Sequence, residues 1–196
     1  MTTPLNDTAL DQTFRNARTI GYYTSQPVPE STLHAIYDLL KWGPTSANQS
    51  PLRIVWCTTP EAKARLAACA SKNNETKILN APVTAILAMD LNFADHLPRL
   101  YPHADARSWF AGNQPLIEES AFRNSTLQGA YFIIAARMLG LDTNPMSGFD
   151  KEKLNAAFFA GTALRVNFIC TLGYGDPAKI HPRNPRLTFE EANTIL

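Results

Sequence analysis

One long helix predicted in the second half of the chain constrains the fold more than any other segment. It runs from Leu116 to Leu139, and Gly140 follows as a stop signal. Its second half, LQGAYFIIAARML, is apolar nearly all round, whereas a helix on a protein surface normally keeps one polar face. We therefore expect this helix to lie at the centre of a core or against a second subunit. Packing by itself accounts for its aromatic residues.

The composition is that of a globular protein. Hydrophobic residues make up 45% and charged residues 18% of the 196 residues, so a single domain spanning residues 1–196 can bury a sizeable core. Eighteen basic residues against seventeen acidic ones leave a formal charge of +1. This balance does not favour nucleic acid or an anionic membrane as a partner.

Cysteine usage and the N-terminal sequence indicate a compartment. The three cysteines, Cys57, Cys69 and Cys170, are widely separated and odd in number, which is typical of buried thiols in a reducing environment. The segment MTTPLNDTALDQTF lacks the basic and apolar regions of a signal peptide, and no stretch is long and apolar enough to cross a bilayer. We expect a cytoplasmic protein.

Other segments alternate between helical and strand patterns. Apolar residues repeat at helical spacing in PESTLHAIYDLLKW, and runs rich in β-branched residues suit buried strands. Between Leu91 and Pro115 the chain shows little periodicity, and a stretch of that length is typically functional or mobile. Helices are predicted over residues 8–18, 29–42, 60–70, 116–139 and 151–159, and buried strands over residues 54–58, 83–90 and 166–172.

A polar loop separates the helix at 29–42 from the first strand. Thr45, Ser46, Asn48, Gln49 and Ser50 are uncharged hydrogen-bonding residues. The loop lacks the glycines and the lysine of a P-loop, and hydroxyl and amide groups suit a flat heterocycle edge better than an anion. The alternative is an ordinary turn, because serine, asparagine and proline are common in loops.

The loop GPTSANQSP resembles the P-S-x-x-N-x-Q-P signature of the nitroreductase-like family of small dimeric flavoproteins. Four further matches follow the family order: Arg18-Thr19, the N-x-x-K of Asn74 and Lys77, the P-x-x-G-F of Pro145–Phe149, and the R-x-P of Arg183–Pro185. The resemblance implies an α+β, nitroreductase-like fold with a central mixed sheet flanked by helices. It also implies a domain-intertwined homodimer with FMN at the subunit interface.

The resemblance further implies roles for particular residues. Arg18 and Arg183 would reach the FMN phosphate, and Asn74 would contact the pyrimidine edge. Lys77 would lie near N1 and C2=O, where a cation stabilises the charge that reduction leaves. A backbone N–H near position 147 would bond to N5. The implied cofactor-binding residues are Arg18, Thr19, Ser46, Asn48, Asn74, Lys77, Met146, Ser147, Gly148, Lys179 and Arg183.

The residues alone allow plainer interpretations of several of these positions. Arg18 and Lys77 would be solvated surface charges, and PMSGFD would be a turn in which Asp150 caps the next helix. The family's longer R-R-S-x-R pattern is only half present, because Gly21 occupies the place of its later arginine.

The irregular segment supplies the substrate candidates. In the family this region covers the flavin, which implies a substrate-side role for Arg107, Trp109 and Phe110. Arg107 or Arg123 would pair with a substrate carboxylate, because the guanidinium fork suits that group. The spacing of His96, His103 and Asp105 fits no recognised metal-ligand pattern, so no metal site is predicted.

Within the family, the phrases FRNSTLQGAYFIIAARMLGLD, NPMSGFD, HADARSWF and PRLTFEEA resemble the RutE/HadB subgroup, associated with pyrimidine catabolism and malonic semialdehyde reduction. The implied reaction is ping-pong hydride transfer from NADH or NADPH, through flavin N5, to malonic semialdehyde, giving 3-hydroxypropionate. No side chain is named as catalytic, because the flavin carries the chemistry. The alternatives are a broad nitroarene or quinone reductase, and a flavin-binding protein without turnover.

Overall fold

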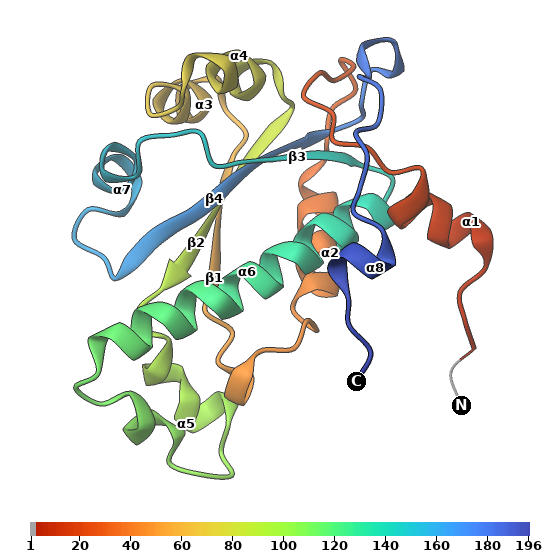
Figure 1. Ribbon diagram of the computed structural model, residues 1–196. Coiled ribbons are helices and arrows are strands. Elements are labelled where there is room, and N and C mark those ends of the chain that lie inside the picture. The colour runs from red at the N-terminus through yellow and green to blue at the C-terminus, as the bar shows by residue number, and fades with distance from the viewer. Residues whose placement is uncertain (1–2) are drawn as a thin grey trace.

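The computed structural model describes residues 3–196 as an α+β fold built on one four-stranded sheet (Figure 1). The strands are β1 (Leu52–Cys57), β2 (Val83–Asp90), β3 (Asp142–Met146) and β4 (Leu164–Gly173). The helices are α1 (Asp7–Leu10), α2 (Glu30–Leu40), α3 (Pro60–Ala67), α4 (Lys72–Asn80), α5 (Leu97–Leu100), α6 (Gln114–Met138), α7 (Lys151–Phe159) and α8 (Phe189–Ala192). No helix within residues 3–196 is both long and apolar enough to cross a membrane.

The strand order is β1-β2-β4-β3, and each pair of neighbouring strands is antiparallel. The expected mixed sheet is therefore not formed by the described part of one chain, where Thr19–Thr143 is the one parallel pairing and is an isolated bridge. Since β2 and β4 already pair on both sides, a parallel strand could be added only outside β1 or β3.

Helices cover both faces of the sheet (Figure 1). Side chains alternate between the two faces along a strand, so Ala85 and Leu87 of β2 join the core under α2 and α6, while Ile86 and Ala88 join the core under α3, α4 and α7. A third, smaller core formed around Phe93, Leu97 and Phe110 holds the segment between β2 and α6 together. The strands are thus buried on both faces, which explains their nearly continuous apolar sequence.

Helix α6 confirms the prediction that one long helix dominates the fold. Gly140 ends it with φ +80°, and the Leu141 N–H donates to the Ala136 carbonyl at 2.9 Å, as expected for a left-handed C-terminal cap. One side of α6 is buried through Ala121, Gly129 and Phe132. Phe122, Leu127 and Tyr131, elsewhere around the helix, are exposed, so the apolar surface of α6 is only partly buried within one chain.

The predicted helices do not include α4 or α8, and three further local features differ from the sequence predictions. The first helical segment ends earlier, in a π-helical turn at Asp11–Arg15. The irregular segment contains short 3₁₀ turns at Phe93–His96 and Ala106–Phe110 together with α5. Strand β3 was not predicted, because DTNPM contains residues disfavoured in strands. Pro145 is tolerated there since β3 is an edge strand.

Candidate functional site

The N-terminal segment, the end of α6 and the C-terminal tail form a small basic pocket. Its cavity measures about 370 Å³. The residues that line it are Phe14, Ala17, Arg18, Thr19, Arg137, His181, Pro182, Arg183, Asn184 and Arg186. Four of these are arginines and none is acidic, so the pocket suits a compact anion with several oxygen acceptors, such as a phosphate group.

Reciprocal hydrogen bonds hold the tail against the N-terminal segment. Arg183 Nη2 donates to the carbonyls of Arg15 at 2.7 Å and Ala17 at 2.9 Å. In return, Arg18 Nη2 donates to the His181 carbonyl. These contacts join residues more than 160 positions apart in the sequence, and they bring together the two arginines that were predicted to bind phosphate.

An amide-rich cluster lies beside the end of β3. Asn74 Nδ2 donates to the Gly148 carbonyl at 3.0 Å, and Lys77 Nζ donates to Asn74 Oδ1 at 3.4 Å. Asn74 is nearly buried, at 9% exposure. A Cβ on Gly148 would lie 2.7 Å from Asn74 Nδ2, so only glycine lets the backbone approach this closely. The cluster offers amide, ammonium and backbone groups to a planar heterocycle.

A short run of chain connects the basic pocket to the amide cluster. Thr19 forms a β-bridge with Thr143, and a Cβ on Gly21 would lie 2.8 Å from Asn144 Nδ2 and 3.1 Å from Lys77 Cδ. Arg18 and Gly21 are three residues apart, a span of at most about 10 Å. One ligand with an anionic end and a planar polar end could therefore contact both groups of residues.

The proposed N5-binding segment has a mixed environment. Met146 is 7% exposed and belongs to the core under α3, α4 and α7. Ser147 and Gly148 are exposed, and the Ser147 carbonyl accepts a hydrogen bond from the Phe149 N–H at 3.0 Å. The predicted N-cap is confirmed, because Asp150 Oδ1 accepts from the Lys153 N–H at 2.9 Å.

The polar loop lies at the other end of α6. The Ser46 N–H donates to Asn124 Oδ1 at 2.8 Å, and Asn48 Nδ2 donates to the Leu100 carbonyl at 2.9 Å. Positions 124 and 137 of α6 are about 20 Å apart at a helical rise of about 1.5 Å per residue. Ser46 and Asn48 are therefore well separated from the basic pocket within one chain.

The predicted substrate residues occupy different environments. Arg107 pairs with Asp95 at 2.7 Å, and Arg123 pairs with Glu119. Trp109 is 52% exposed and packs edge-on against Tyr101. Phe110 is buried in the small core, where its ring lies edge-on to Phe93 with 4.8 Å between centroids. Trp109 is thus accessible to a ligand, whereas Phe110 is part of the small core that holds the segment between β2 and α6 together.

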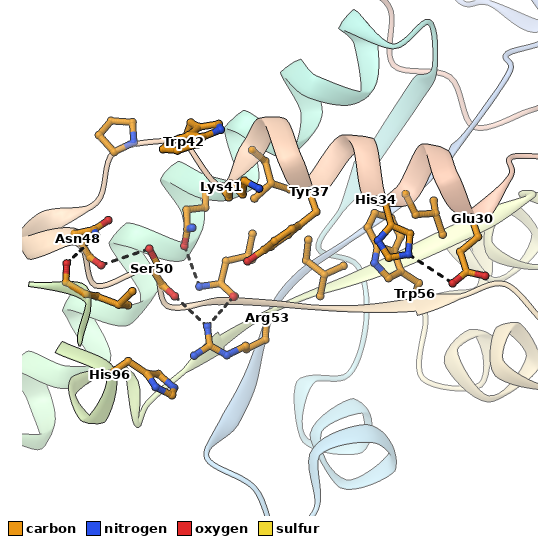
Figure 2. Close-up of a pocket in the computed structure, with 18 of the residues that line it drawn as sticks. Glu30, His34, Tyr37, Lys41, Trp42, Asn48, Ser50, Arg53, Trp56 and His96 are labelled. Atoms are coloured by element: carbon orange, nitrogen blue, oxygen red, sulfur yellow. Dashed lines mark hydrogen bonds and ion pairs between the residues drawn. The ribbon is translucent and has the colours of Figure 1, made fainter. Parts of the chain in front are cut away.

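A larger groove of about 1290 Å³ runs between α2 and the outer edge of β1. Asn48, Ser50, Arg53 and His96 lie at one end of it, and Glu30, His34 and Trp56 lie at the other (Figure 2). Arg53 is held by Asp90, 2.6 Å away. His103 does not line this groove and packs against Tyr101. No group of three or more potential metal-binding side chains occurs in the described chain.

Sequence reasoning missed part of the basic pocket. Arg137, Arg186 and His181 were not among the predicted site residues, although all three line the pocket. Lys179 was included, but it lies 3.8 Å from Asp176 and over the Tyr22 ring. A search for arginines beyond the R-x-P motif would have found Arg186. No local sequence pattern identifies Arg137 as a pocket residue.

Comparison with known proteins decides the family. The sequence matches the profile of the Nitroreductase family over residues 14–174. This chain belongs to the nitroreductase family. A Burkholderia lata protein with the provisional name NADH dehydrogenase/NAD(P)H nitroreductase is 60% identical over 193 residues, covering 98% of this chain and 99% of that protein. A Stenotrophomonas maltophilia protein of the same provisional name is 55% identical over 195 residues, covering 100% of both.

Solved structures confirm the nitroreductase fold. A Bacillus subtilis nitroreductase, also provisionally named, superposes with a TM-score of 0.85 at 18% identity, covering 97% of this chain and 100% of that one. A provisionally named Exiguobacterium sibiricum nitroreductase, solved in complex with FMN, gives a TM-score of 0.85 at 20% identity over 100% of both chains. The predicted nitroreductase-like α+β class is therefore confirmed, as is membership of a family of oxidoreductases.

Proposed function

We propose that this nitroreductase is a cytoplasmic, single-domain FMN-dependent NAD(P)H oxidoreductase. The observation that carries the proposal is the short link, through residues 18–21, between a pocket with four arginines and the Asn74–Lys77 cluster. FMN has the matching chemistry, a phosphate at one end and a polar pyrimidine edge at the other. The FMN bound to the Exiguobacterium relative supports the same assignment.

The residues of this chain fit FMN on structural grounds. Arg18 and Arg183 would hold the phosphate, Asn74 and Lys77 would orient the pyrimidine edge, and Gly148 leaves room for close backbone approach. When bound, FMN supplies hydride transfer at N5 between NADH or NADPH and an acceptor. The chain would position the ring, and the Lys77 ammonium would stabilise the negative charge that develops on reduction.

We also propose a homodimer in which the polar loop of one subunit completes the site of the other. Ser46 and Asn48 lie about 20 Å along α6 from the basic pocket, so within one chain they cannot share a ligand with Arg137. The unpaired outer edge of β1, the exposed Tyr37 and Trp42, and the exposed apolar residues of the tail provide surface for a second copy. A strand of the second copy added parallel to β1 at that edge would also give the expected mixed sheet.

The proposed acceptor is malonic semialdehyde, reduced to 3-hydroxypropionate in pyrimidine catabolism. The support is the RutE/HadB-like sequence of α6 and the segments around it. Arg107 and Arg123 are the candidates for pairing with the substrate carboxylate, which would compete with Asp95 and Glu119. Replacing both arginines with alanine should raise KM for malonic semialdehyde and leave KM for a neutral nitroarene unchanged. An unchanged KM for both acceptors would exclude these two residues.

Two measurements test the proposed activity. FMN-loaded protein should lose the visible absorbance of oxidised flavin when NADPH or NADH is added anaerobically, whereas a flavin-binding protein without turnover would keep it. Malonic semialdehyde should then be turned over with kcat/KM at least about tenfold above that for nitrobenzene. The reverse ranking would favour a nitroarene or quinone reductase, the function suggested by the names of the relatives.

A further inference from the structure

Arg137 is a charged residue whose position the family signature does not explain. It lies in the last turn of α6, half-buried, and lines the basic pocket. Its Nη1 donates to the Thr13 carbonyl at 3.2 Å. Its Nε is buried and has no hydrogen-bond partner among the described residues, and no carboxylate within residues 3–196 lies within 4.0 Å of the guanidinium.

Such an environment disfavours a lone cation. A buried donor without an acceptor loses its hydration without replacement, and burial lowers the pKa of the Arg137 guanidinium, with nearby Arg183 acting in the same direction and Asp142 opposing it. Arg18 and Arg183 add further positive charge around the same cavity. An anion in the pocket would offset this repulsion and accept hydrogen bonds from the guanidinium where it lines the cavity.

The other arginines have different local roles. Arg18 and Arg183 each donate to backbone carbonyls across the junction between the tail and the N-terminal segment. Arg186 Nη1 donates to the carbonyls of Asn184 and Pro185 in its own segment. Arg137 differs because it comes from the last turn of the core helix α6, and its Nη1 bonds the Thr13 carbonyl and no carbonyl of the tail. It can therefore position an anion from the inner side of the pocket.

We propose that Arg137 is a phosphate-binding residue, whose guanidinium contacts the terminal phosphate of FMN in the basic pocket and raises affinity for FMN over riboflavin. This inference rests on the proposed function, because it takes FMN as the ligand. It adds to the two signature arginines a third, supplied by the last turn of α6.

The test compares two flavins that differ only in the phosphate. Dissociation constants of FMN and riboflavin are measured by flavin fluorescence for the wild type and for Arg137→Gln, Arg137→Lys and Arg165→Gln. Arg165 is a matched control, since it is exposed on β4 and its Nη1 bonds only to the carbonyls of Thr162 and Leu164. Circular dichroism verifies the fold of each variant, and Arg137→Lys serves if Arg137→Gln does not fold.

The expected result is selective for the phosphate. Arg137→Gln should raise Kd for FMN at least about tenfold, as for the loss of a charge-assisted hydrogen bond, and should change Kd for riboflavin less than about twofold. Arg137→Lys should recover part of the loss, and Arg165→Gln should match the wild type. An FMN Kd within twofold of wild type in the Arg137 variants, or equal weakening of both flavins, would overturn the proposal. Wild-type protein that binds neither flavin would instead refute the proposed function.

Discussion

At the scale of single residues, the polar loop before β1 combines ligand-type side chains with an unfavourable backbone. Ala47, Asn48 and Ser50 have φ of 48°, 49° and 42°, in the left-handed region that residues with a Cβ avoid. The Gln49 side chain between them is fully buried and bonds Ser120 at 3.0 Å. The surrounding contacts therefore hold the loop in one conformation, as expected for a segment that must present Ser46 and Asn48 accurately.

Substitution of Ala47 tests this strain. Ala47→Val should lower the free energy of unfolding by about 1–3 kcal/mol, because a β-branched residue is strongly disfavoured at positive φ. Ala47→Gly should change it by less than about 1 kcal/mol, since relief of strain opposes the greater freedom of the unfolded chain. Urea denaturation measures both. Equal stability of the valine and glycine variants would mean that the loop is not constrained.

The Cys57 thiol gives a second prediction at this scale. Burial raises the pKa of Cys57 from its ordinary value of 9.0 to about 11. Because the folded pKa is the higher one, the stabilisation is fully present below pH 9 and is lost as pH rises toward 11. Between pH 8 and pH 10.5 the wild type should lose about 2 kcal/mol more stability than Cys57→Ala. Denaturant unfolding at the two pH values measures this difference, and parallel losses would contradict it.

At the scale of elements, α6 connects the two ends of the site. Its N-terminal half supports the polar loop through Asn124, and its last turn contributes Arg137 to the basic pocket. The position of both ends relative to the sheet depends on how α6 packs against it, and Gly129 is a point of close approach. A Cβ there would lie 2.6 Å from the Phe168 ring of β4.

Gly129→Ala should therefore separate α6 from β4. The added methyl group cannot fit without movement of the Phe168 ring, so the free energy of unfolding should fall by about 1–3 kcal/mol despite the better helix propensity of alanine. Gly129→Ala combined with Phe168→Leu should recover part of this loss. Thermal unfolding of the single and double variants provides the comparison, and additive effects would show that the two positions do not interact.

At the scale of the whole molecule, the separated polar loop and basic pocket require two chains if they serve one ligand. Lys77→Glu should disrupt the pyrimidine side of the site in the subunit that carries it. Asn48→Trp should disrupt the site in the partner of the subunit that carries it. Each homodimer should be inactive. When both are co-expressed, random pairing should restore roughly a quarter of wild-type activity, because half of the dimers are mixed and each mixed dimer has one intact site.

Purified mixed dimers carrying two different affinity tags give the sharpest form of this measurement. They should bind one FMN tightly per dimer and show about half of wild-type activity. Absence of recovery in the mixed dimers would indicate that each chain builds its site alone, and the proposed arrangement across two subunits would then be incorrect.

The sequence alone predicted most of the helices and three of the four strands, because apolar periodicity and stop signals such as Gly140 are local. It also placed Arg18 and Arg183, Asn74 and Lys77 in a shared role through short motifs. It did not reveal β3, whose five residues form a strand only because β4 pairs with them.

Only the tertiary structure brought Arg137 into the pocket with Arg18 and Arg183, and only it showed Phe110 to be core and the polar loop to be far from that pocket. The physical reason is that local patterns report how exposed a segment is to water, whereas these placements depend on contacts between different segments of the chain. The sequence by itself therefore determined which segments form most of the helices and strands. The packing of these elements determined which residues make up the site.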